Sequence, residues 1–95
     1  MEIKIFERTG EFAEDKDIAR DIRLKEIMPA LKKGENVILD FYKVNSSTQS
    51  FIHALISEVI RKETIEVLDR IEFKNCNDTL KKIIGIVTDY MQKPT

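Results

Sequence analysis

Apolar residues recur along the chain with two different spacings. Some segments alternate apolar and polar residues, which predicts strands, and others repeat apolar residues every three or four positions, which predicts helices. Alternation over Met1 to Phe6 predicts a strand with one wet face. Thr9-Gly10 then marks a turn, and Glu11 to Ala13 predicts a brief return strand. From about Asp15 the apolar spacing becomes near-helical and predicts a helix. The residues that carry this spacing are Ile18, Ile22, Met28 and Leu31.

Pro29 interrupts the first helical pattern. Proline lacks a backbone donor and its ring clashes with the preceding turn, so we expect a kink or a restart near Ile27. The helix should stop at Lys32-Lys33-Gly34, which places cations in the last turn and a glycine after it.

The middle of the chain predicts a buried strand followed directly by a helix. Val37 to Tyr42 is apolar except for Asp40. Such continuous apolarity predicts burial on both faces, hence a central strand covered by helices. A second helix should run from about Thr48 to Lys62 with a broad buried stripe. That stripe comprises Phe51, Ile52, Leu55, Ile56, Val59 and Ile60.

The last third of the chain holds one ambiguous segment and one clear helix. Glu63 to Arg70 fits either an extension of the second helix or a short strand through Thr64 to Leu68. Alternation over Arg70 to Lys74 predicts a strand, and Asn77 should cap the helix that follows. Pro94 closes that helix, whose apolar face comprises Leu80, Ile83, Ile84, Val87 and Met91.

The order strand, helix, strand, helix, strand, helix predicts one α/β domain over residues 1–95, with right-handed crossovers between parallel strands. We expect a three- to four-stranded, mostly parallel or mixed sheet with about three helices. The sequence leaves open whether these helices lie on both faces of the sheet or mainly on one.

Composition narrows the class of protein. Sixteen basic and seventeen acidic residues give a net charge of -1, which argues against a dedicated nucleic-acid binder. No apolar run approaches the roughly 18 residues needed to cross a bilayer, and the start lacks the layout of a signal peptide. We therefore expect a cytoplasmic protein that does not enter a membrane. One cysteine and one histidine leave no metal-ligand cluster, so we expect neither a metal nor another cofactor.

Hydroxyl side chains gather where the central strand gives way to the second helix. They are Ser46, Ser47, Thr48 and Ser50, with Gln49 between them. A helix cap accounts for Ser47 or Thr48, at about 1 kcal/mol, but a cap needs only one residue. Ser50 then falls in the first turn, where a phosphoryl group would meet free N–H donors and the positive end of the helix dipole. Open α/β sheets bind ligands and partners at this corner.

Asp40 is the one charged residue of the central strand. A lone buried charge is costly, so its carboxylate should be hydrogen-bonded or lie at the wet end of the strand. Its expected role is to orient the following loop by accepting backbone N–H bonds. The alternative is that it helps to present the hydroxyl groups of the loop.

The remaining reactive side chains form no catalytic constellation. His53 follows Ser50 by three residues and shares a helix face with it. No glycine elbow precedes the serine and no oxyanion-hole motif is visible, which favours a surface or half-buried histidine. Cys76 lies between a strand and a helix, a position that can lower the pKa of a thiol. We expect no enzymatic activity.

The run Val37-Ile38-Leu39-Asp40-Phe41, then Val44, then Ser47-Thr48-Gln49-Ser50-Phe51 resembles the signature of the small STAS-like family of unknown function. The resemblance extends more weakly over Arg20 to Glu35 and Ile71 to Asn75. That family is similar in turn to STAS domains proper, the anti-sigma-factor antagonists of bacterial partner-switching systems. In those domains a serine at the start of a helix is phosphorylated by a protein kinase of the histidine-kinase ATPase fold, and phosphorylation releases the partner.

An ungapped alignment from Leu39-Asp40 sets this chain against the Asp-Ser-Ser-Gly motif of those antagonists. Thr48 takes the place of the aspartate and Gln49 that of the first serine. Ser50 matches the phosphorylated serine, and Phe51 replaces the glycine. The resemblance thus implies Ser50 as the phosphorylation candidate, with Thr48 second, and a histidine-kinase-type ATPase as partner.

We therefore expect a non-enzymatic bacterial regulatory module that binds a protein partner through its central corner. The residues expected there are Asn45, Ser46, Ser47, Thr48, Gln49, Ser50 and His53. One alternative is a small-molecule or nucleotide-binding module that uses the same helix N-terminus and has a concave pocket. Another is a structural subunit that forms a homodimer through a sheet edge, with Met1 to Phe6 as the candidate strand.

Overall fold

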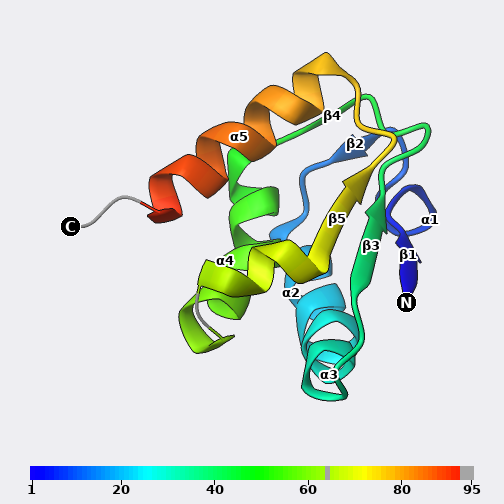
Figure 1. Cartoon of the computed structure of the whole chain (residues 1–95). Helices are drawn as coiled ribbons and strands as arrows, with labels where there is room; N and C mark the ends of the chain where they lie inside the picture. The colour runs from blue at the N-terminus through cyan, green and yellow to red at the C-terminus, as the bar shows by residue number, and fades with distance from the viewer. Residues whose placement is uncertain (64, 93–95) are drawn as a thin grey trace.

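The computed structural model describes residues 1–63 and 65–92, and it has the mixed α/β architecture that the sequence predicts. Figure 1 shows the arrangement of its elements. The strands are β1 (Glu2–Lys4), β2 (Phe12–Ala13), β3 (Val37–Asp40), β4 (Ser46–Ser47) and β5 (Ile71–Lys74). The α-helices are α1 (Phe6–Thr9), α2 (Lys16–Ile22), α3 (Met28–Lys32), α4 (Gln49–Glu63) and α5 (Asp78–Gln92).

The strands form two small parallel sheets. One has the order β1-β3-β5, so the predicted central strand is indeed central, and the other pairs β2 with β4. Because the larger sheet follows chain order, both of its crossovers run in the same direction. Right-handed crossovers then place their helices on the same face. This order answers the question that the sequence left open.

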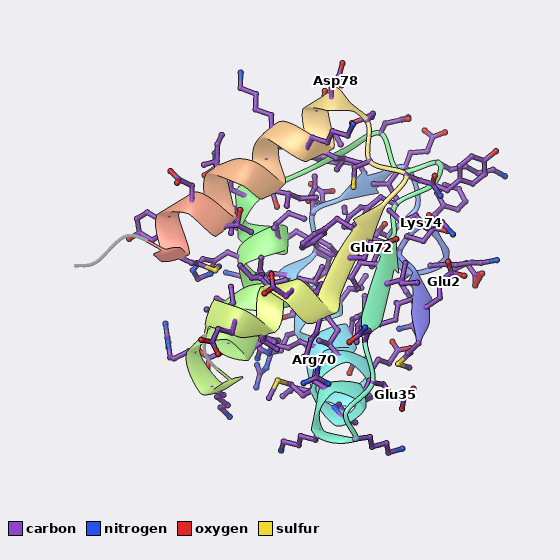
Figure 2. The ribbon with its side chains drawn as sticks, viewed as in Figure 1. Glu2, Glu35, Arg70, Glu72, Lys74 and Asp78 are labelled. Carbon is purple, nitrogen blue, oxygen red and sulfur yellow. The ribbon has the colours of Figure 1, made fainter. Side chains whose placement is uncertain are left out.

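The other face of the larger sheet is charged and uncovered. Glu2, Glu72 and Lys74 are exposed there, and Figure 2 shows them on the right, away from α4 and α5. The residues that alternate with these along the strands point to the opposite face, and among them Ile3 and Leu39 are buried against the helices. The central strand is nevertheless buried at Val37, Leu39 and Asp40 and half-buried at Ile38, so its residues on both faces are largely shielded, as the sequence predicts.

A π-helical stretch, Arg23–Ile27, joins α2 to α3. The Met28 N–H bonds to the Arg23 carbonyl five residues back, and Pro29 falls in the first turn of α3. This is the restart near Ile27 that the proline predicts. Gly34, at φ +85°, follows the end of α3 as expected.

Several boundaries differ from the sequence-based expectations. Phe6 begins the short helix α1 instead of ending a strand, and β3 stops at Asp40, leaving Tyr42 exposed in a turn. The segment Ile65–Arg70 is a 3₁₀ helix, so the alternative of a strand there is wrong. The expected end of the last helix at Pro94 lies outside the described residues.

The core lies between the covered face of the sheet and the helices. Its largest fully buried side chains include Phe41, at the end of the central strand, and Phe51, in the first turn of α4. α5 buries Leu80, Ile84 and Val87, the apolar face that its spacing predicts. The start of α4 is thus held rigidly by apolar contacts directly beneath its polar residues.

Candidate functional site

Thr48 caps the N-terminus of α4. Its Oγ1 accepts a hydrogen bond from the Phe51 N–H at 3.0 Å, as an N-cap threonine should. Its own N–H donates to the Ala13 carbonyl at 3.0 Å, which continues the pairing of β4 with β2. The small second sheet therefore fixes where α4 begins.

Ser47, immediately before the cap, is buried and its hydroxyl donates to the Thr48 carbonyl at 3.0 Å. The Ser47 side chain therefore stabilises the turn before α4, and a protein partner cannot contact it in this conformation. The pairing of Ser46–Ser47 with β2, which the sequence does not indicate, causes this burial.

Gln49 and Ser50, the first two residues of α4, are exposed. Their backbone N–H groups have no hydrogen-bond acceptor in the described part of the chain, since the first turn of a helix lacks carbonyls behind it. Ser50 thus combines a free hydroxyl with neighbouring donors that favour negative charge.

A surface pocket of about 460 Å³ opens beside these residues, within the range of 300–1,000 Å³ typical of ligand sites. It lies between the start of α4 and the second half of α5, with Lys16 of α2 at its rim. Its lining residues are Lys16, Gln49, Ser50, His53, Ala54, Ile86, Val87 and Tyr90.

The structure brings three of the candidate residues together and sets others apart. Gln49, Ser50 and His53 share the pocket, and His53 is exposed. No hydrogen bond joins Ser50 to His53 among the described residues. Asn45 and Ser46 do not line the pocket: the Asn45 N–H donates to the Glu11 carbonyl at 2.7 Å.

The residues that complete the pocket come from α2 and α5, which sequence reasoning did not connect to this corner. Ile86 is 43% exposed and Tyr90 is 72% exposed, although both are large and partly apolar. The sequence contained a signal for these residues, because Ile86 and Tyr90 lie beside the buried face of α5 in the helical repeat. Their position indicates that the apolar surface of α5 is broader than the core requires.

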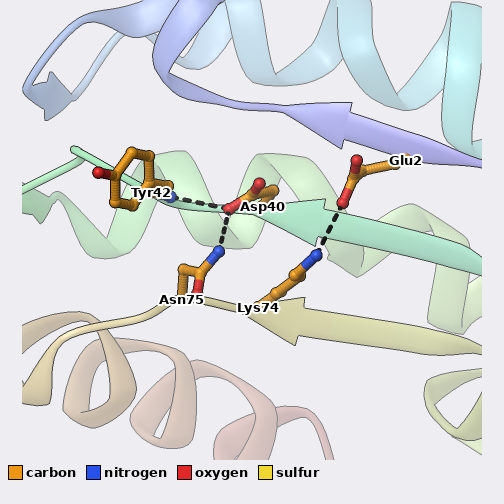
Figure 3. Close-up of polar contacts among 5 residues, drawn as sticks. All are labelled: Glu2, Asp40, Tyr42, Lys74 and Asn75. Atoms are coloured by element: carbon orange, nitrogen blue, oxygen red, sulfur yellow. Dashed lines mark hydrogen bonds and ion pairs between the residues drawn. The ribbon is translucent and has the colours of Figure 1, made fainter.

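Asp40 ends the central strand and fastens two loops, as Figure 3 shows. Its Oδ1 accepts from the Asn75 side-chain amide and from the Tyr42 N–H, both at 2.9 Å. These two bonds, with that to Asn75 the larger cause, hold the pKa of the carboxyl below its ordinary value. The carboxylate therefore orients the loop that leads toward β4.

Lys74 and Glu2 form an ion pair at 3.2 Å across the uncovered face of the sheet (Figure 3). The hydrogen bond to Glu2, followed by the charge of the same carboxylate, raises the pKa of Lys74. Both side chains are exposed, so the pair contributes little to stability.

Cys76 is half-buried after β5. Burial raises the pKa of its thiol, which outweighs the opposing effect of Lys81. The reasoning that a position between a strand and a helix lowers this pKa is therefore wrong, since desolvation dominates. No group of three or more potential metal ligands among His, Cys, Asp and Glu is found in residues 1–63 and 65–92.

Comparison with known protein families gives a match over most of the described fold. Residues 19–81, more than half of the chain, match the family described as a STAS-like domain of unknown function. The chain belongs to this family. The resemblance seen in the Leu39-Asp40 and Ser47 to Phe51 residues is thereby confirmed.

The STAS-like match covers β3, β4, α4 and β5 but excludes Lys16 and the second half of α5. The pocket therefore combines residues inside the matched region with residues beyond it. Searches of the curated proteins and of the solved structures find no match. Within the described residues, no helix is both long and apolar enough to span a bilayer.

Proposed function

We propose that this STAS-like domain is a non-enzymatic regulatory module of a bacterial cytoplasm that binds a protein partner at the start of α4. The partner would be a histidine-kinase-type ATPase, and phosphorylation of Ser50 would switch the interaction. The observation that carries this proposal is the setting of Ser50, exposed in the first helical turn at the edge of an open pocket.

The geometry favours Ser50 over Thr48 as phosphoacceptor. The Thr48 Oγ1 accepts the hydrogen bond that caps α4, so phosphorylation of this oxygen would remove the cap. A phosphoryl group on Ser50 would instead add about 1.5 to 2 negative charges beside free N–H groups and near Lys16, which lines the same pocket. Phosphorylation of Ser50 would therefore leave the Thr48 cap of α4 intact and add negative charge to the surface around Ser50.

The contact surface in this proposal consists of Gln49, Ser50 and His53, with Asn45 of the preceding loop and Ser46 of β4 beside them. All five have accessible side chains, in contrast to the buried Ser47. The hydrogen bond from Asn77 to the Asn45 carbonyl, at 2.8 Å, ties that loop to the start of α5. A partner would therefore meet a preformed surface.

The test uses a histidine-kinase-type ATPase from the same organism, purified and incubated with the protein and Mg-ATP. Intact-mass analysis should show the gain of one phosphoryl group, lost in Ser50→Ala and kept in Ser57→Ala, a half-buried serine of the same helix. If the mass of the wild-type protein does not change, the proposed phosphorylation switch is wrong.

Binding to the ATPase by calorimetry tests the surface separately. Ser50→Glu should change the affinity at least about tenfold, whereas Asn36→Glu, an exposed control distant from the pocket, should not. Equal affinities for both variants and the wild type would contradict the proposed surface.

The pocket itself favours a second candidate function, the binding of a small molecule. Its volume and mixed lining suit a ligand with an apolar part and an anionic group facing Lys16. Thermal unfolding with ATP, ADP and inorganic phosphate as probes would then show a rise in Tm. Tyr90→Ala should abolish that rise, and its persistence would place binding elsewhere.

A further inference from the structure

A second hollow of the surface, separate from the pocket beside Ser50, lies between the π-helical stretch, α3 and the second half of α4. We call it the basic groove. Its volume of about 260 Å³ is below the range of 300–1,000 Å³ typical of small-molecule sites, so it has room for side chains of a partner rather than for a whole cofactor. One wall comprises Arg23, Leu24, Met28, Pro29 and Lys32, and the other comprises Glu58 and Lys62.

A hydrogen bond holds the two walls together. Arg23 Nη1 donates to the Ala54 carbonyl at 2.8 Å, which joins the π-helical stretch to α4. The Arg23 Nε is buried and has no acceptor among the described residues. Most buried donors in proteins have a hydrogen-bond partner. Arg23 thus brings a positive charge and an unsatisfied donor to a groove whose walls are already in place.

Positive charge dominates the basic groove. Arg23, Lys32 and Lys62 form no ion pair with any described residue, and both lysines are exposed. The carboxylate of Glu58 pairs with Arg61 at 2.8 Å, so its charge is already balanced. Cations in the last turn of a helix favour the helix dipole, which accounts for the lysines but supplies no counter-ion. Three positive charges therefore remain without an anion in the described part of the chain.

The apolar part of the basic groove consists of Leu24, Met28 and Pro29. Leu24 is 50% exposed, whereas Met28 is buried and Pro29 is half-buried. Lys32 follows Met28 by four positions and Pro29 by three, so it lies on the same side of the helix. A methionine side chain adapts its shape to different partners. Apolar surface and cations therefore meet within one groove.

We propose that the basic groove docks an acidic segment of a partner protein. One large apolar side chain of that segment packs on Leu24 and Met28. The carboxylates beside it pair with Arg23, Lys32 and Lys62. Charge complementarity selects this occupant, because three unpaired cations around apolar surface favour carboxylates next to an apolar residue.

This surface is separate from the one around Ser50. The two lie at opposite ends of α4, since Lys62 follows Ser50 by twelve positions, about 18 Å along the helix. A partner can therefore occupy the basic groove whether or not Ser50 is phosphorylated.

A membrane fits these features less well than a peptide does. Helices that lie on a bilayer present several exposed apolar side chains together with their cations. Leu24 is the only strongly exposed apolar residue among those that line the basic groove. A hollow surface also complements a protruding side chain better than it complements a flat array of lipid headgroups.

Fluorescence anisotropy tests the docking with a labelled peptide of sequence Ser-Glu-Glu-Phe-Glu-Glu-Ser. The contact is small, so we expect a dissociation constant between about 10 μM and about 200 μM at low salt. Replacing every Glu of the peptide by Gln, or its Phe by Ser, should raise that constant at least about fivefold. Added salt at about 0.5 M should weaken binding, because it screens the charges. No binding at about 1 mM protein, or equal binding of the three peptides, would overturn the proposal.

Four variants test whether the peptide occupies the basic groove. Lys62→Glu and Leu24→Ser should each raise the dissociation constant at least about fivefold, since they reverse a cation and remove an apolar contact. Lys82→Glu makes the same charge change on α5, and Ile86→Ser removes an apolar residue that is 43% exposed. Both controls should leave the constant within about twofold. Circular dichroism checks that all four variants fold. Equal weakening by Lys62→Glu and Lys82→Glu would mean unspecific charge attraction and would contradict docking in the groove.

Vesicles of phosphatidylserine and phosphatidylcholine distinguish a peptide site from a membrane site. The wild-type protein should not sediment with them at about 0.1 M salt. Sedimentation that Lys62→Glu abolishes would assign the basic groove to a lipid surface, and the proposed acidic peptide would then be wrong.

Discussion

The side-chain amide of Asn75 donates to Asp40 Oδ1 at 2.9 Å, joining the loops that follow β5 and β3. Asn75 reaches this position with φ +58°, a conformation that asparagine tolerates better than most residues. The residue at one end of this bond, Asn75, must therefore adopt a positive φ, and the residue at the other end, Asp40, has a buried carboxylate.

We predict that Asp40→Ala lowers the free energy of unfolding by about 1 to 3 kcal/mol, because it removes a carboxylate that satisfies two donors. Urea unfolding followed by circular dichroism measures the loss. Asn75→Gly keeps the positive φ accessible while deleting the amide, so it should cost less than Asp40→Ala. If Asp40→Ala is neutral, the carboxylate does not hold these loops.

The same carboxylate should contribute to acid sensitivity. Folding lowers the pKa of Asp40, so its stabilisation is complete above its ordinary pKa of about 3.9 and is lost as pH falls through the lower folded value. Asp40→Asn should therefore show a smaller loss of stability than the wild type on going from neutral to acidic pH. Urea midpoints at a series of pH values measure this difference, and parallel curves for the two proteins would contradict it.

The two hydroxyl groups at the start of α4 should differ in their effect on stability. Thr48→Ala removes the cap of the Phe51 N–H and should cost about 1 kcal/mol. Ser50→Ala removes an exposed hydroxyl from the first turn and should change stability by less than about 0.5 kcal/mol. Thermal unfolding of the two variants gives the comparison. A larger cost for Ser50→Ala would mean that this side chain supports the fold.

Two glycines should respond to the same substitution with opposite signs. Gly85 lies within α5, with nothing within 4 Å of an added Cβ, so Gly85→Ala should stabilise the protein by about 0.5 to 1 kcal/mol. Gly34 has equal space but φ +85°, so Gly34→Ala should destabilise it. Urea unfolding of both variants tests the pair, and a destabilised Gly85→Ala protein would indicate a packing requirement at that position.

Cys76 should react slowly with iodoacetamide at neutral pH, because burial raises the pKa of its thiol and leaves little thiolate. The rate should rise on addition of denaturant, which removes the burial. Mass spectrometry over a pH series measures both effects. Faster alkylation in the folded protein than in the unfolded chain would mean that the thiol is activated.

Local patterns predicted the elements whose contacts are local. The spacing of apolar residues identified α4 and the buried face of α5, and Asn77 was recognised as the cap whose side-chain oxygen accepts a hydrogen bond from the Leu80 N–H. The corner at Thr48 was located because the strand, the hydroxyl residues and the helix are contiguous in the chain. These features need no knowledge of distant partners.

Features that depend on distant segments escaped prediction. Ser47 is buried because β4 pairs with β2, more than 30 residues earlier in the chain. The pocket requires α5 to pack beside the start of α4, which no single stretch of sequence encodes. Likewise, the uncovered face of the sheet follows from strand order, and composition alone does not reveal strand order.

The π-helical stretch sets a limit on how this chain can vary. Ile22 and Ile27 are both fully buried although five positions apart, a separation that a regular helix would place on different sides. Deleting one residue between them would leave them four positions apart, a separation that a regular α-helix places on one side, so the stretch would become α-helical with Leu31 still in the interior. The loss of a second residue would rotate α3 by about 100° and turn Leu31 out of the interior.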